Sequence, residues 1–97
     1  MNRAYELGFI IPISVLEADT QAVIATVRAW IEELGGEIRK VDYWGRRRMA
    51  YTIKDYREGY YVFLQMDFPP LRLNELEYNL RLSEQVLRHL VVRLDED

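Results

Sequence analysis

The run Trp44-Gly45-Arg46-Arg47-Arg48 joins an aromatic ring to three guanidinium groups. A guanidinium fork matches phosphate oxygens and stacks on nucleobases, and unpaired RNA bases also stack on aromatic rings. Adjacent arginines repel one another, a cost that a purely structural strand has little reason to carry. We therefore expect RNA binding here. The competing interpretation is an edge strand whose arginines only keep it soluble.

Charge is unevenly distributed along the chain. The 97 residues carry 13 basic and 16 acidic side chains, a net charge of −3. Residues 39–57 alone hold seven basic and two acidic side chains, a net of +5, so the remainder carries −8. Because salt screens charges beyond about 8–10 Å, an anionic partner should meet this one segment.

Few residues could support catalysis. His89 is the only histidine, Ser14 and Ser83 are the only serines, and cysteine is absent. A general base needs a placed partner, a metal needs a cluster of ligands, and neither pattern occurs. We expect His89 to be a surface or partly packed residue, and we expect no enzyme activity, no cofactor, no metal and no small-molecule substrate. The apolar stretches are also too short to cross a membrane.

Hydrophobic periodicity predicts six elements. A period of two predicts strands over residues 5–13, with the odd positions buried, and over residues 37–53, 59–67 and 86–94. A helical stripe follows Asp19, a candidate N-cap, and ends at Gly35-Gly36. A second helix is expected from Pro69-Pro70 to about Leu82, and residues 54–58 are expected to form a polar turn.

Alternation along residues 37–53 predicts which side chains share a face. Val41, Tyr43, Met49, Tyr51 and Ile53 have one parity, and Trp44, Arg46 and Arg48 have the other. Arg47 is then on the opposite side from its two arginine neighbours. Gly45 indicates a bulge or a close backbone approach.

The order β-α-β-β-α-β over residues 1–97 predicts a single α+β domain of ferredoxin-like type. Right-handed crossovers turn this order into a four-stranded antiparallel sheet with both helices on one face. The other face has no helix to cover it. We expect function on that bare face.

A ten-residue segment makes the chain resemble a known family. Residues 45–54 read Gly-Arg-Arg-Arg-Met-Ala-Tyr-Thr-Ile-Lys. This resembles the signature of bacterial small-subunit ribosomal protein number six: a glycine, basic residues, Leu-Ala-Tyr, then x-Ile-Lys. Met49 stands for the usual leucine, a volume-conserving change, and Thr52 for a common proline. Further similarity lies in Arg3-Ala4-Tyr5-Glu6, in Gly59-Tyr60-Tyr61 and over residues 86–93.

The resemblance implies a structural role in the ribosomal small subunit, hence in the cytoplasm. It implies binding to 16S ribosomal RNA as a heterodimer with the small basic ribosomal protein number eighteen, which the acidic remainder of the chain would help to attract. We expect RNA at Arg46, Arg47, Arg48 and Lys54, with Arg3 and Arg88 as further candidates, and the protein partner near Trp44, Tyr61 and Phe63. The sequence leaves open which face takes RNA and which takes protein.

Two other functions fit the same element order. An RRM-type binder of single-stranded RNA needs aromatic residues one, three and six positions after the strand glycine. After Gly59 these positions hold Tyr60, Val62 and Gln65, so only one matches. A dimeric ferredoxin-like ligand-sensing domain needs a polar pocket with convergent ionisable groups, and no such constellation is present.

Overall fold

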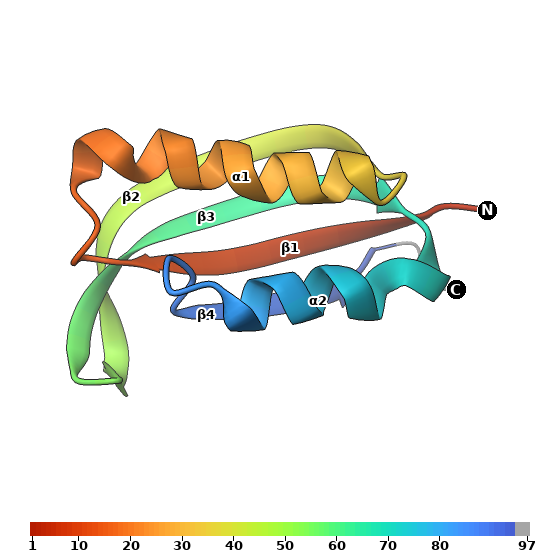
Figure 1. The fold of residues 1–97 in the computed structure, drawn as a ribbon. Coiled ribbons are helices and arrows are strands. Elements are labelled where there is room, and N and C mark those ends of the chain that lie inside the picture. Colours follow the sequence, from red (N-terminus) through yellow and green to blue (C-terminus); the bar gives the residue numbers. More distant parts are fainter. Residues whose placement is uncertain (95–97) are drawn as a thin grey trace.

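The computed structural model describes residues 1–94, and its elements follow the predicted order. They are β1 (Arg3–Pro12), α1 (Thr20–Glu33), β2 (Glu37–Ile53), β3 (Tyr56–Phe68), α2 (Leu73–Leu82) and β4 (Arg88–Arg93). The strands form one sheet in the order β2-β3-β1-β4, with every neighbouring pair antiparallel. Both helices cover the same face, and the far end of the β2–β3 hairpin extends beyond them (Figure 1). The predicted ferredoxin-like α+β fold is confirmed.

Strict alternation along the central strands builds the core. On β1 the odd residues Tyr5, Leu7, Phe9 and Ile11 are buried, as predicted. Across from them β3 buries its even residues, and the two sets are paired in register, for example Leu7 with Leu64. Apolar residues of both helices close this side, which we call the helix face. The remaining side chains of the sheet lie on the open face.

A threonine hydroxyl is bonded at the start of helix α1, and two glycines follow its end. The Asp19 side chain makes no capping hydrogen bond; instead the Thr20 hydroxyl donates to the Glu17 carbonyl at 2.8 Å. At the other end Gly35 has φ +96°, a conformation that favours glycine. A Cβ on Gly36 would lie 2.6 Å from the Phe68 ring, so the second glycine is needed for close packing. The predicted helix stop is confirmed, and the predicted Asp19 side-chain cap is wrong.

The β2–β3 hairpin is tighter than the sequence predicted. Instead of a polar turn over residues 54–58, Ile53 pairs with Tyr56 and only two residues form the loop. These residues, Lys54 and Asp55, have φ angles of +49° and +70°. Two-residue loops with positive φ match the right-handed twist of their strands. Strand β2 therefore ends at Ile53 as predicted, and β3 begins at Tyr56, three residues earlier than predicted.

A bulge in β2 reverses the predicted alternation. Tyr43 pairs with Val62 and Gly45 with Tyr61, so Trp44 is an extra residue. Beyond it the even positions turn to the helix face, because Arg46 pairs with the buried Tyr60. The prediction that Trp44 shares a face with Arg46 and Arg48 is therefore wrong. The bulge also separates Met49 and Tyr51 from Val41 and Tyr43: Met49 is buried but outside the core cluster.

Strand β4 begins at Arg88, two residues later than predicted. Val86 is buried ahead of the strand. Within the strand Leu90 pairs with Gly8 and Val92 with Glu6, which places both apolar side chains on the open face. They are 66% and 44% exposed. The apolar residues that alternate along β4 therefore face the uncovered side of the sheet and not the core.

Leu76→Ala is expected to destabilise the fold by about 2–5 kcal/mol, because a fully buried leucine leaves a cavity when truncated. The matched control is Leu71→Ala, since Leu71 is 97% exposed and its truncation should cost less than about 0.5 kcal/mol. Urea denaturation measures both. Equal losses for the two variants would contradict this account of the core.

Candidate nucleic-acid and protein interface

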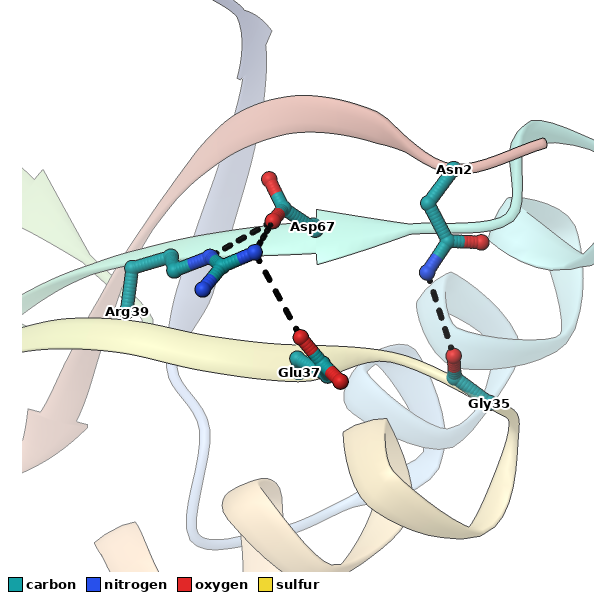
Figure 2. Close-up of polar contacts among 5 residues, drawn as sticks. All are labelled: Asn2, Gly35, Glu37, Arg39 and Asp67. Atoms are coloured by element: carbon teal, nitrogen blue, oxygen red, sulfur yellow. Dashed lines mark hydrogen bonds and ion pairs between the residues drawn. The ribbon is translucent and has the colours of Figure 1, made fainter.

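Part of the basic segment is neutralised by the chain's own carboxylates. Arg46 donates through Nε to Glu58 Oε1 at 2.6 Å, and this hydrogen bond and charge raise the pKa of Arg46 above its usual value. Arg39 contacts Asp67 and Glu37, as Figure 2 shows. The same view contains the Asn2 side chain donating to the Gly35 carbonyl. Such exposed ion pairs add little to the stability of the fold, because water screens them.

Four other cations of the segment form no ion pair within residues 1–94. They are Arg47, Arg48, Lys54 and Arg57, and all four are exposed. All lie on the β2–β3 hairpin, from the bulge to the tip. Arg57 was not among the site residues predicted from the sequence. Arg57 lies on β3, two residues after the Lys54-Asp55 loop, and Arg48 lies on β2, so both belong to the same hairpin. The hairpin therefore presents unneutralised positive charge.

The bulge places an aromatic stack beside these cations. The Trp44 and Phe63 ring centroids lie 4.5 Å apart with the planes at 50°. The Arg47 guanidinium carbon lies 5.6 Å from the Trp44 ring centroid, a cation–π distance. Trp44 remains 51% exposed. Trp44, Phe63 and Arg47 thus form one continuous surface on the open face, where alternation alone had paired Trp44 with Arg46.

The two outlying candidate arginines lie at different places. Arg88 pairs with Ile10 on the open face, donates to the Tyr51 hydroxyl at 2.7 Å and lies 5.9 Å from that ring's centroid. The Arg88 side chain of β4 therefore contacts the β2–β3 hairpin through Tyr51. Arg3 pairs with Phe68 at the opposite end of β1, roughly 30 Å along the strand from Pro12 at 3.3 Å per residue. The structure brings Arg88 to the arginine cluster and leaves Arg3 away from it.

An apolar hollow occupies the middle of the open face. Its volume is about 200 Å³. Its lining includes the two expected partner-binding residues Tyr61 and Phe63, and also Ile10, Leu90 and Val92. These last three residues were not predicted from the sequence. The signal for them was their even position in strands whose odd positions are more buried. Exposed apolar surface of this kind is typical of a protein-binding site.

The single histidine of the sequence, His89, contacts a carboxylate of helix α2. His89 lies on the helix face, where its ring contacts Glu77 Oε1 at 2.9 Å and its side chain is 13% exposed. This confirms a partly packed histidine. Among residues 1–94 no three His, Cys, Asp or Glu side chains gather as metal ligands. In the same part of the chain no helix is long and apolar enough to span a membrane.

Comparison with known proteins identifies the class. The family model described as ribosomal protein S6 matches residues 4–93. Small ribosomal subunit protein bS6 of Carboxydothermus hydrogenoformans is 41% identical, covering 99% of this chain and 100% of its own. The Moorella thermoacetica protein of the same name is 40% identical, covering 98% and 97%. These matches define a structural protein of the small ribosomal subunit, located in the cytoplasmic ribosome.

Two solved structures are similar to this chain, one in sequence and fold and the other in fold alone. The crystal structure of 30S ribosomal protein S6 from Thermotoga maritima superposes with a TM-score of 0.91 at 34% identity, covering 97% of this chain and 89% of that one. A structure of the chemotaxis kinase CheA P2 domain with CheY from the same organism reaches 0.66 at 15% identity, with 97% and 100% covered, which shows the fold alone. The chain belongs to the ribosomal protein S6 family. This family is not enzymatic, which confirms the expectation of no enzyme activity.

The φ of +81° at Gly45 yields a prediction about the bulge. Gly45→Ala should destabilise the protein by about 1–3 kcal/mol, because a Cβ disfavours this backbone region. A Cβ there would have space, with Tyr43 Cε2 at 3.8 Å, so crowding adds little. Gly45→Asn is the control and should cost less, since asparagine tolerates positive φ. Urea denaturation of both variants gives the order, and a more stable alanine variant would contradict it.

Proposed function

We propose that this protein binds 16S ribosomal RNA together with the small basic ribosomal protein number eighteen. The observation that carries the proposal is a group of four exposed cations on the β2–β3 hairpin that form no ion pair within residues 1–94, in a chain whose net charge is −3. Phosphate contacts by lysine and arginine supply most nonspecific RNA affinity. An acidic chain with one cationic hairpin binds RNA at that hairpin and gains from a basic companion elsewhere.

The geometry favours a division between the two partners. Arg47, Arg48, Lys54 and Arg57 follow the projecting hairpin, and Arg46 joins them by exchanging its weak pair with Glu58 for a phosphate. Arg88 lies beside them through Tyr51. The apolar hollow lined by Tyr61 and Phe63 suits protein, because protein interfaces are depleted of charge at their centre. Trp44 lies between the two regions.

The RRM alternative is weakened by the position of its one matching aromatic residue. Tyr60 is 4% exposed and faces the helices, so no base can stack on it. Tyr61 and Phe63 do lie on the open face, but they line an apolar hollow. The ligand-sensing alternative needs convergent ionisable groups. Glu6 and Arg88 line this hollow at opposite ends, with apolar side chains between them, so they do not converge.

A sucrose gradient of a lysate from the source organism tests the ribosomal role. We expect the protein to sediment with the small subunit, and to stay there at low salt. A protein confined to the top of the gradient would contradict the proposal. Antibody detection of the chain across the fractions is the measurement, with a small-subunit RNA probe as the reference.

Salt titration tests the RNA site. With ribosomal protein number eighteen present, Arg47→Ala and Arg48→Ala should each reduce the slope of log affinity against log salt by about 0.7–0.9, one phosphate contact apiece. Arg81→Ala is the matched control, because Arg81 is exposed on α2 on the other side of the sheet. Filter binding to a 16S central-domain fragment measures the slopes. Unchanged slopes for both hairpin variants would place the RNA elsewhere.

A further inference from the structure

Glu6 is a carboxylate at the edge of the apolar hollow. It lies on the open face of β1, between Gln65 of β3 and Val92 of β4. Its burial is intermediate, and no ion pair or side-chain hydrogen bond within residues 1–94 includes it. A partly desolvated carboxylate is costly when it has no cation nearby. A bound partner can supply that cation.

The surface next to Glu6 is built to receive an aliphatic chain. The hollow that Glu6 lines continues over Gly8 to Ile10 and Leu90. Gly8 has no side chain there, and a Cβ would lie 2.8 Å from the Phe63 ring, so the ring rests directly against the strand. The walls therefore combine an aromatic ring with branched aliphatic side chains. Lysine and arginine lay their methylene stems along such surfaces and extend their charged heads beyond them.

The opposite end of the hollow excludes a second cation. Arg88 lines that end, opposite Ile10 and four residues along β1 from Glu6, about 13 Å away at 3.3 Å per residue. Its guanidinium is held by the Tyr51 hydroxyl. The hollow is thus negative at one end, apolar in the middle and positive at the other. A bound side chain with a positive head is oriented by this arrangement.

We propose that the hollow binds one lysine or arginine side chain of ribosomal protein number eighteen, with its stem against Phe63 and Leu90 and its head on the Glu6 carboxylate. This rests on the proposed function, which supplies a basic protein as the partner. The charge of the chain outside residues 39–57, −8, favours the approach of such a protein. Glu6 then fixes the position of the partner on the sheet, because a buried charge pair tolerates little displacement.

Three substitutions distinguish a cationic occupant from an apolar one. The measurement is calorimetric titration with purified ribosomal protein number eighteen, and each variant's fold is checked by urea denaturation. Glu6→Gln should weaken binding about tenfold, since a charge-assisted hydrogen bond is lost. Glu6→Leu should weaken it at least as much, although it enlarges the apolar surface. Leu90→Arg should abolish binding, because it fills the hollow with a like charge.

Matched controls lie on the helix side of the molecule. Glu33→Gln removes an exposed carboxylate at the end of α1, and Leu82→Arg changes a leucine that is 64% exposed, close to the 66% of Leu90. Both should leave the affinity within about twofold. The salt dependence of binding should also fall in Glu6→Gln and not in Glu33→Gln, a readout that loss of packing alone would not move.

The outcomes separate this inference from the proposed function. Weakened binding by both Glu6 variants supports a cationic side chain at Glu6. Tighter binding by Glu6→Leu, or unchanged binding by Glu6→Gln, overturns it while the partner still binds, and so leaves the proposed function in place. If the unaltered protein does not bind ribosomal protein number eighteen with or without the RNA fragment, the proposed function fails and this inference fails with it.

Discussion

The bulge at Trp44 and Gly45 is the constraint on which the arrangement of the functional surface depends. One extra residue in β2 reverses which side chains face the helices. It turns Arg46 toward Glu58 and directs Arg47 to the open face, where its guanidinium lies over the Trp44 ring and that ring contacts Phe63. Without it, alternation would place Trp44 with Arg46. The positive φ of Gly45 makes this local change possible at little cost.

The second determinant is the way charge is distributed relative to the sheet. The chain neutralises some of its own cations: Arg39 and Arg46 contact carboxylates of β3, and Lys40 contacts Asp42 on its own strand. Within residues 1–94, four cations of the projecting hairpin form no ion pair: Arg47, Arg48, Lys54 and Arg57. The carboxylate of Glu6 lies instead beside the apolar hollow. One small sheet thus presents a cationic end and, on its open face, an apolar hollow bordered by the Glu6 carboxylate.

Much of the fold could be predicted because each element repeats a simple pattern. The odd positions of β1 and the stripe of α1 are apolar, and Gly35-Gly36 ends the helix. The errors occur where a single residue changes geometry. The two-residue loop at Lys54-Asp55 lets β3 begin at Tyr56, earlier than predicted. At the start of α1 the side-chain hydrogen bond comes from the Thr20 hydroxyl and not from Asp19. Among the residues that line the hollow, Tyr61 and Phe63 were predicted, but Leu90 and Val92 were not, because these exposed side chains resemble core residues until the strand order is known.

The sequence by itself determined the element order, the buried face of the central strands and the concentration of arginine near Gly45, because composition and periodicity are local properties. Only the tertiary structure decided which arginines are neutralised, that Arg3 lies far from Arg88, and that Glu6 borders an apolar hollow. Those facts depend on pairing between strands distant in the chain and on one inserted residue. A shift of one residue exchanges the two faces of a strand, and no local pattern records it.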